Sequence, residues 1–151
     1  MLCKDIMNPD VECVSARTSV REAACRMRDR NIGFLPVCDE SMHAIGVVTD
    51  RDITIRIVAN EQKLTMPVEA AMSPDVIACL PEDDLNFARE LMALHHKSRI
   101  MCVSREGQLE GVISLSDIAQ FDASAGAATL RQVSGREALG SFWAAANSDR
   151  I

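Results

Sequence analysis

Two stretches of the chain share one arrangement of apolar and polar residues. Gly46 to Ile53 places an apolar pair after a glycine, then a hydroxyl residue, and then an aspartate three residues after the hydroxyl. Gly111 to Ile118 repeats this order further along the chain. An apolar pair of this kind is typical of a strand that is buried on both faces. We therefore expect each stretch to form a short buried strand, a tight turn and the start of a helix.

The repeat continues far outside these two stretches. When the chain is compared with itself at the shift that places Gly46 on Gly111, identical residues coincide along its length and no gap is needed. The coinciding pairs include Met1 and Met66, Met7 and Met72, Pro9 to Val11 and Pro74 to Val76, Ala23 and Ala88, and Met27 and Met92. Because two copies are too few for a solenoid, the repeat predicts two like units that pack face to face about a pseudo-twofold axis.

The first unit is predicted to follow the order strand, helix, strand, strand and helix. A helical lead-in over residues 2–7 should stop at Asn8, because a residue that precedes proline is pushed out of the helical region. Ser19 and Glu22 have the spacing of a capping box, which marks the start of the first helix. We expect strands at 11–14, 32–38 and 45–48, and a second helix at about 50–58.

The second unit is predicted to repeat this order over residues 76–80, 83–96, 99–104, 109–113 and 115–121. These elements suggest a first unit at 1–58, a polar linker at 59–66, a second unit at 67–121 and a C-terminal tail at 122–151. In the tail, residues 122–129 are rich in Ala, Ser and Gly, which is typical of a flexible link. Residues 136–146 could form one short helix that docks on its own pair of units or on a neighbouring chain. A disordered tail is the alternative.

Composition and charge narrow the class of protein. The chain has 151 residues, of which 48% are hydrophobic and 25% are charged, as is ordinary for a soluble globular protein. The net charge of −6 argues against a nucleic-acid-binding surface, which needs a basic face, although a nucleotide needs only a few local cations. No apolar run approaches the roughly 20 residues of a membrane span, and the N-terminus lacks the apolar core of a signal peptide. We therefore expect a cytoplasmic protein without a nucleic-acid or membrane partner.

Six cysteines, at positions 3, 13, 25, 38, 79 and 102, are spread along the chain without a Cys-x-x-Cys pair. Most lie within apolar patterns, so we expect them to act as small buried hydrophobic residues. Two alternatives stay open. Cys102 could form a zinc site with His95 or His96, although this spacing matches no standard ligand set. A redox sensor is the other alternative, and it would need a thiol whose pKa is lowered.

Each unit also carries an ordered set of short motifs. They are Asp5 to Pro9, Asn31 to Val37 and Gly46 to Ile53 in the first unit, and Met72 to Pro74, Ser98 to Val103 and Gly111 to Ile118 in the second. Each set resembles the CBS motif, named from cystathionine β-synthase, and the chain resembles a stand-alone pair of CBS domains over residues 1–121. The second unit departs from the family at Met101, where proline is usual. We expect this departure to weaken the start of the strand there.

The resemblance implies an α/β fold in which two tandem β-α-β-β-α units pack through their sheets and leave two clefts for adenosine-type ligands. One cleft would take Ser114, Ser116 and Asp117 from the second unit, and its other wall would be Ile32, Gly33, Phe34 and residues 7–13, which include Val11. Arg99 could reach a phosphate there. The other cleft would take Thr49, Arg51 and Asp52, which would face residues 72–78, including Val76, and Lys97, Ser98 and Arg99.

The chemistry of these residue types suggests their roles. Asp52 and Asp117 would accept hydrogen bonds from the two ribose hydroxyls. Thr49, Ser114 and Ser116 would donate to phosphate or ribose oxygens, Arg51 and Arg99 would neutralise phosphate charge, and Ile32, Val11 and Val76 would sandwich the adenine. The alternative is that the two aspartates and the hydroxyls beside them only cap helices, because a helix start favours both residue types.

No catalytic motif accompanies these features. The sequence contains no nucleophile elbow, no phosphate-binding glycine loop, no histidine-based triad and no metal-ligand cluster. We therefore expect a protein that is not an enzyme and requires no cofactor.

Our first hypothesis is a regulatory homodimer that binds an adenine nucleotide (AMP, ADP or ATP) or S-adenosylmethionine between its units, with NAD(H) as a further ligand within the family. Ligand binding would shift the balance between two packings of the units and so signal to an unknown effector protein. The alternative is a structural oligomerisation or partner-docking module with vestigial clefts, which the tail with Trp143 favours. A thiol redox or metal sensor ranks third.

Overall fold

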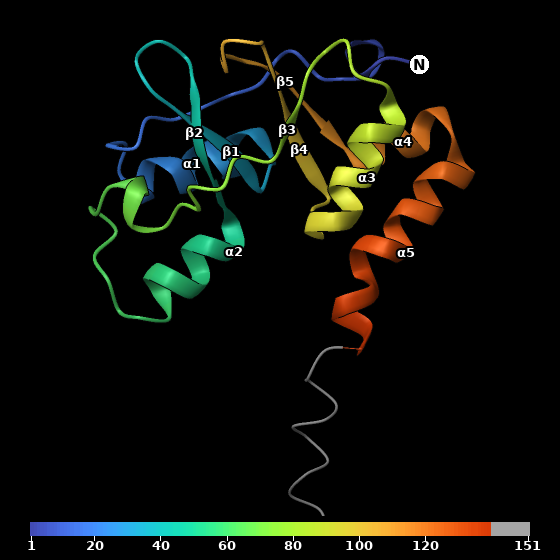
Figure 1. The fold of residues 1–151 in the computed structure, drawn as a ribbon. Helices are drawn as coiled ribbons and strands as arrows, with labels where there is room; N and C mark the ends of the chain where they lie inside the picture. Colours follow the sequence, from blue (N-terminus) through green and yellow to red (C-terminus); the bar gives the residue numbers. More distant parts are fainter. Residues whose placement is uncertain (140–151) are drawn as a thin grey trace, which may run out of the picture.

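The computed structural model describes residues 1–139, which form two halves of similar build (Figure 1). The first half contains a 3-10 turn at Cys3–Asp5, α1 (Val20–Arg30), β1 (Phe34–Cys38), β2 (Ala44–Thr49) and α2 (Asp50–Asp52), which continues as a π-helix over Ile53–Val58. The second half contains a 3-10 turn at Val68–Ala70, β3 (Ala78–Cys79), α3 (Leu85–His95), β4 (Arg99–Val103), β5 (Leu109–Ser114) and α4 (Leu115–Phe121), and α5 (Ala123–Leu139) follows. The predicted α/β class with two tandem units is confirmed.

The repeat extends to the pairing of individual strand positions. β1 pairs antiparallel with β2 so that Val37 lies opposite Gly46, and β4 pairs antiparallel with β5 so that Cys102 lies opposite Gly111. In both pairs the register shifts immediately after this position. Because Cys102 and Gly111 are the repeat counterparts of Val37 and Gly46, the two hairpins have the same register.

The strand predicted at residues 11–14 is wrong, because only Val14 pairs, in a single parallel bridge with Val37. The Val14 amide donates to the Pro36 carbonyl at 3.0 Å, and the Cys38 amide donates to the Val14 carbonyl at 2.9 Å. The next hydrogen bond of a parallel ladder would need an amide hydrogen on Pro36, which proline lacks. The ladder therefore stops after one residue.

Met101 occupies the position of Pro36 in the second half, and it lengthens the ladder. Its amide donates to the Ile77 carbonyl at 3.2 Å, and β3 pairs with β4 at both Ala78 and Cys79. The expectation that Met101 weakens the start of its strand is therefore wrong, because the residue supplies a backbone donor that proline could not.

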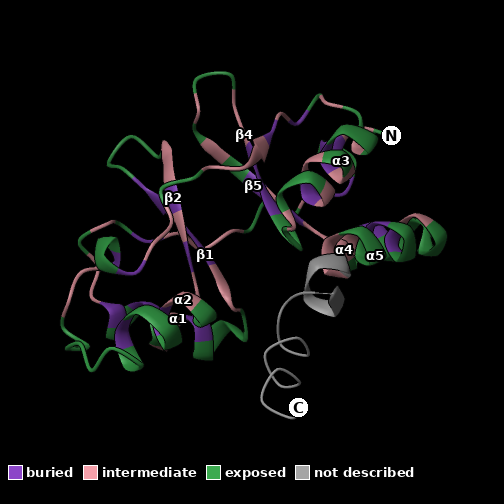
Figure 2. Cartoon of the chain, turned by 60° about the horizontal axis from the view of Figure 1, so that its bottom comes forward, coloured by how far each residue is buried: buried purple, intermediate pink, exposed green. Residues whose placement is uncertain are grey.

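Each half has its own apolar core, and each core contains a segment that precedes the other half in sequence (Figure 2). Cys3 and Ile6 are buried in the core of the second half, whereas Val68 and Ala71 are buried in the core of the first. We call residues 1–8 and 66–73 the crossing segments. In Figure 1, the N-terminus accordingly lies on the side of the second half.

Backbone bridges hold the two crossing segments in equivalent places. One crossing segment pairs with the start of α3 and with β5, and the other pairs with the start of α1 and with β2. The bridges are Leu2 with Asp84 and Asn8 with Val112 in one case, and Pro67 with Ser19 and Ser73 with Val47 in the other. The two halves therefore share backbone hydrogen bonds as well as apolar contacts.

The flexible link predicted at residues 122–129 is wrong, because this stretch forms the first part of α5, which packs against α3 and α4. Thr129 is buried, and its hydroxyl donates to the Ala125 carbonyl at 2.9 Å and accepts from Arg89 Nε at 3.0 Å. The short helix predicted at 136–146 falls partly within α5, and Phe142 and Trp143 lie outside the described residues. Within residues 1–139, none of the helices combines the length and the apolar character that crossing a membrane requires.

Gly126 provides a test of how α5 packs. A Cβ atom at this position would lie 2.6 Å from the Ala119 Cβ and 2.7 Å from the Ala119 Cα. Gly126→Ala alone would favour the helix by about 1 kcal/mol. Because α5 lies directly on α4, we expect the substitution to lower the free energy of unfolding by about 1–3 kcal/mol instead, as measured by chemical denaturation. The exposed neighbour Ala127→Ser is the control and should change stability by less than about 0.5 kcal/mol. A stabilised Gly126→Ala would contradict the packing.

The crossing segments predict how the chain can be divided. A fragment of residues 8–72 holds the complete core of the first half, whereas a fragment of residues 1–66 of nearly equal length lacks Val68 and Ala71. We expect only the 8–72 fragment to show a cooperative thermal transition by circular dichroism, because the incomplete core leaves apolar surface unburied. Equal behaviour of the two fragments would show that the crossing segment contributes nothing to that core.

Candidate functional site

Two clefts lie where residues of the two halves meet. The first, which we call the Asp117 cleft, has a volume of about 180 Å³. Of the predicted ligand-binding residues, those that line it are Val11, Ile32, Phe34, Arg99, Ser114 and Asp117. The second, which we call the Asp52 cleft, has a volume of about 430 Å³. Of the predicted residues, those that line it are Gly33, Phe34, Thr49, Arg51, Asp52, Lys97, Ser98 and Arg99.

Two predicted residues line neither cleft. Ser116 is exposed on the first turn of α4, and Val76 is half-buried just after the second crossing segment, where its neighbours Asp75 and Ile77 line a small separate cavity of about 20 Å³. The structure therefore brings together the predicted carboxylates, their adjacent hydroxyls and the opposing strands, and leaves Ser116 and Val76 outside.

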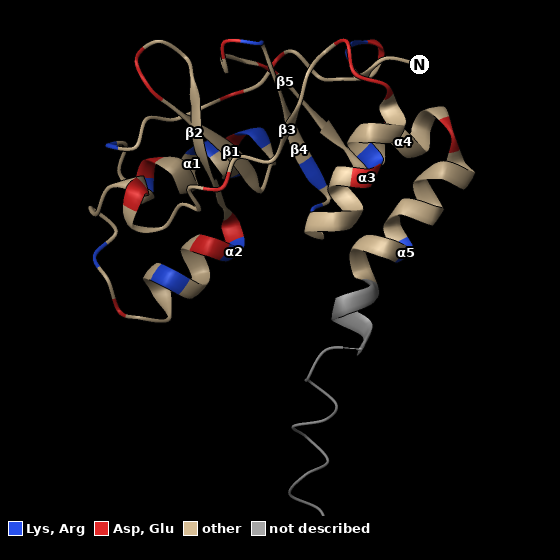
Figure 3. Cartoon of the chain, in the orientation of Figure 1, with Lys and Arg blue, Asp and Glu red and all other residues tan. Residues whose placement is uncertain are grey.

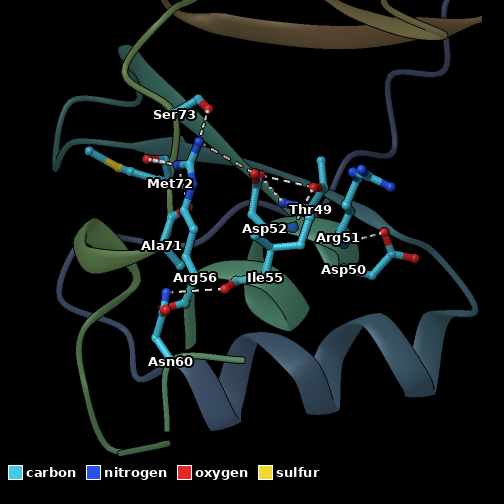
Figure 4. A network of polar contacts seen from close by, with 10 residues as sticks. All are labelled: Thr49, Asp50, Arg51, Asp52, Ile55, Arg56, Asn60, Ala71, Met72 and Ser73. Atoms are coloured by element: carbon cyan, nitrogen blue, oxygen red, sulfur yellow. Dashed lines mark hydrogen bonds and ion pairs between the residues drawn. The ribbon is translucent and has the colours of Figure 1, made fainter. Parts of the chain in front are cut away.

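The hydroxyl and the carboxylate of each motif bind one another as a helix cap. In the Asp52 cleft, Asp52 Oδ2 accepts from the Thr49 amide at 2.9 Å and from the Thr49 hydroxyl at 2.8 Å (Figure 4). The Asp52 amide donates to Thr49 Oγ1 at 3.1 Å. In the Asp117 cleft, Asp117 Oδ2 accepts from the Ser114 amide at 2.7 Å and from the Ser114 hydroxyl at 2.6 Å, and the Asp117 amide donates to Ser114 Oγ at 3.2 Å. The capping interpretation is therefore correct for both motifs.

Capping leaves one carboxylate oxygen of each motif for a ligand. Both bonds from the hydroxyl residue end on Oδ2, and Asp52 Oδ1 lies 3.7 Å from an Arg56 guanidinium nitrogen. Among residues 1–139, no hydrogen-bond partner contacts Asp117 Oδ1. Because the Thr49 and Ser114 hydroxyl hydrogens already point to carboxylates, these hydroxyls can serve a ligand as acceptors while the cap is intact.

Arg56 is a site residue that sequence reasoning missed. Its guanidinium donates to the carbonyls of Ala71 and Met72, both at 2.8 Å, and to Ser73 Oγ at 3.3 Å (Figure 4). It therefore ties the second crossing segment to the helix that begins at Asp50. The signal was present in the sequence, because Arg56 lies one helical turn after Asp52 and so shares its face.

Several other lining residues were also missed. They are Val112 in the Asp117 cleft, and Val47, Asp50 and His96 in the Asp52 cleft, whereas Asn8, Asp10, Glu12 and Ser73 lie within the walls predicted at residues 7–13 and 72–78. The sequence pattern indicates a surface position for His96, but the residue is half-buried at the end of α3 in a left-handed conformation (φ 51°). Its Nδ1 is buried and has no hydrogen-bond partner within residues 1–139. The Asp52 cleft thus holds one buried polar atom that the described chain does not satisfy.

The cysteines take no part in either cleft. Cys3, Cys38, Cys79 and Cys102 are buried, and Cys13 and Cys25 are half-buried. Burial raises the pKa of the Cys38 thiol to about 12, and the hydrogen bond with Cys102, whose Sγ is 3.4 Å away, is the main reason that the pKa of Cys79 rises to about 12. These thiols remain protonated near neutral pH, which makes them poor nucleophiles and poor metal ligands.

The alternative zinc site does not form among the described residues. Cys102 is fully buried against Cys79, whereas His95 is exposed at the end of α3. Within residues 1–139, no three His, Cys, Asp or Glu side chains gather closely enough to hold a metal ion.

The caps predict a stability effect that is independent of any ligand. Asp52→Ala and Asp117→Ala each remove the acceptor of two hydrogen bonds, so we expect each to lower the free energy of unfolding by about 1–2 kcal/mol in ligand-free protein. Asp52→Asn and Asp117→Asn keep an oxygen that can accept these bonds and should retain most of that stability. Chemical denaturation of the four variants measures the difference. If alanine and asparagine had equal effects, the aspartates would not act as caps.

Comparison with known proteins identifies the family to which the chain belongs. The family model of the CBS domain matches the chain twice, over residues 3–59 and 68–124. The chain is 30% identical over 118 residues to Hypoxic response protein 1 of Mycobacterium tuberculosis, a match that covers 78% of this chain and 82% of that protein.

Solved structures show the same fold. Hypoxic Response Protein I with two coordinated zinc ions gives a TM-score of 0.73 at 27% identity, over 80% of this chain and 98% of that chain. The CBS domain pair of protein MJ0100, in complex with 5′-methylthioadenosine and S-adenosyl-L-methionine, gives a TM-score of 0.74 at 23% identity, over 82% of this chain and 97% of that chain. CBSX2 in complex with AMP gives a TM-score of 0.72 at 24% identity, over 82% of this chain and 96% of that chain.

Proposed function

The chain belongs to the CBS-domain family as a tandem pair of units, and from this premise we propose that it is a regulatory protein that binds an adenosine-type ligand between its units. The observation that carries the proposal is that each motif aspartate lines a cleft, and that the opposite wall of this cleft comes from the other half of the molecule. A ligand in such a cleft contacts both halves at once.

The lining residues fit the parts of an adenosine compound. A carboxylate oxygen at a helix start can accept from ribose hydroxyls, and these bonds are strong because the acceptor is charged. In the Asp117 cleft, Val11, Ile32 and Phe34 offer apolar surface to the two faces of an adenine ring. In the Asp52 cleft, the basic side chains on α2 and at the start of β4 offer cations to phosphate. MJ0100 and CBSX2 share the fold and bind ligands of this class, but their identity to this chain is low, so the proposal depends on the chain's own residues.

Regulation would follow from the position of the clefts. A ligand that binds one relative arrangement of the halves more tightly than another shifts the population toward it. Arg56 joins the Asp52 cleft to the second crossing segment, so a change at that cleft would also move a segment that is buried in the core of the first half. The receiver of the signal would be an effector protein, and the protein would act by binding rather than by catalysis. Its cytoplasmic location stays a prediction.

A structural interaction module is the second candidate, and exposed apolar side chains favour it. Ile55 and Val58, in the π-helix after α2, are 47% and 57% exposed, and Leu94 on α3 is 71% exposed. Burial of such groups against a second copy of the chain would stabilise a homodimer. The two candidates are compatible, because none of these three side chains lines a cleft, but only the first requires a ligand.

Thermal denaturation with AMP, ADP, ATP, NAD(H) and S-adenosylmethionine tests the proposal on the wild type, Asp52→Asn and Asp117→Asn. A ligand at 100 times its dissociation constant adds about 2.7 kcal/mol to the free energy of unfolding. We expect at least one ligand to raise the midpoint, and one asparagine variant to lose that rise because its carboxylate charge is gone. Protein that is folded and free of co-purified nucleotide, yet unaffected by every ligand, would leave the interaction module as the function.

A further inference from the structure

The two clefts differ sharply in charge, although the repeat makes them equivalent in position. Four cationic residues line the Asp52 cleft, namely Arg51, Arg56, Lys97 and Arg99, against the carboxylates of Asp50 and Asp52. Three carboxylates line the Asp117 cleft, namely Asp10, Glu12 and Asp117, and Arg99 is its one lining cation among the described residues. Figure 3 shows the basic residues beside α2 and at the start of β4.

The repeat shows where this difference comes from. At the shift that places Gly46 on Gly111, each cation of the Asp52 cleft has an uncharged counterpart in the other half. The counterpart pairs are Arg51 and Ser116, Arg56 and Phe121, Lys97 and Ile32, and Arg99 and Phe34. Ile32 and Phe34 line the Asp117 cleft, so apolar surface takes the place of two cations there. Arg99 borders both clefts and is the one cation that the Asp117 cleft receives from β4.

Existing ion pairs leave the contrast in place. Glu12 is the best neutralised carboxylate of the Asp117 cleft, since Arg30 lies 2.8 Å and Arg26 lies 3.6 Å from its oxygens. Asp10 forms no ion pair among the described residues. In the Asp52 cleft, Arg51, Lys97 and Arg99 likewise form no ion pair with a carboxylate among the side chains of residues 1–134. Asp50 in the Asp52 cleft and Arg99 in the Asp117 cleft also form no ion pair among the described side chains, so the unpaired charges sum to a positive value in the Asp52 cleft and to a negative value in the Asp117 cleft.

We propose that the Asp52 cleft binds a phosphorylated adenine nucleotide, and that the Asp117 cleft binds an adenosine compound without phosphate, either neutral or cationic. The inference rests on the proposed function. A nucleotide phosphate carries up to two negative charges near neutral pH, which guanidinium groups bind as bidentate partners and which unpaired carboxylates repel.

Isothermal titration calorimetry with three probes tests the division: AMP, neutral 5′-methylthioadenosine and cationic S-adenosylmethionine. Arg51 and Ser116 occupy equivalent positions in the two motifs. The variant Arg51→Ser places in the first motif the serine of the second, and Ser116→Arg places in the second motif the arginine of the first. Both positions are exposed, so neither change disturbs a core. Arg105→Ser, in the exposed turn between β4 and β5, makes the same change in charge away from both clefts and serves as the control.

We expect Arg51→Ser to weaken AMP binding by about tenfold, the effect of losing one charge-assisted contact, and to leave 5′-methylthioadenosine binding unchanged. Ser116→Arg should weaken S-adenosylmethionine binding and add a second AMP site. Raising the salt concentration should weaken AMP binding and leave 5′-methylthioadenosine binding unaffected, because only the former depends on charge. Arg105→Ser should behave as the wild type.

Two results would overturn the division while leaving the proposed function intact. One is AMP binding that survives Arg51→Ser but is lost in Asp117→Asn. The other is 5′-methylthioadenosine binding that is lost in Asp52→Asn and kept in Asp117→Asn. If none of the three probes, and none of ADP, ATP and NAD(H), binds folded protein at millimolar concentration, the proposed function itself fails together with the division.

Discussion

The crossing of two short segments is the constraint on which the rest of this structure depends. Residues 1–8 complete the core of the second half, and residues 66–73 complete the core of the first. The first half needs residues 66–73, which come before the second half in sequence, to complete its apolar core. The second half needs residues 1–8, which come before the first half. The crossing also shapes the clefts, because Asp10 and Val11, just after the first crossing segment, line the Asp117 cleft, and Ser73, at the end of the second, lines the Asp52 cleft.

Much of the fold and of the site could be predicted from the sequence, because the motif and its repeat can both be recognised without knowing which distant residues meet in space. The order glycine, apolar pair, hydroxyl and aspartate specifies a buried strand and a capped helix, and the internal repeat specifies two of them. What the sequence pattern missed depends on partners far away in the chain. Residues 11–14 have the composition of a strand, but the missing amide hydrogen of Pro36 leaves all but one of them unpaired. Residues 122–129 have the composition of a link, but α3 and α4 give them a surface on which a helix is stable.

The same distinction applies to individual site residues. Asp52 and Asp117 could be identified from their motif, and Asp10 and Glu12 lie in the wall predicted at residues 7–13, whereas His96 lines a cleft at the point where a helix ends in a left-handed turn. The motif aspartates cap helices and are also the residues that we propose to bind a ligand, two roles that sequence reasoning treated as alternatives. One carboxylate oxygen caps the helix and holds the group in place, and the other oxygen is left to face the cleft. The capping role is therefore compatible with the ligand-binding role that we propose for the same side chain.

The contacts of the first crossing segment have a consequence for the synthesis of the protein. The Cys3 amide donates to the Asp83 carbonyl and the Lys4 amide to the Pro81 carbonyl, both at 2.9 Å. A chain emerging from the ribosome at about 5–20 residues per second cannot form these bonds until its second half has been made. The first residues translated are therefore among the last to reach their native positions. The core of the first half, by contrast, can be completed during elongation, as soon as residues 66–73 leave the ribosome.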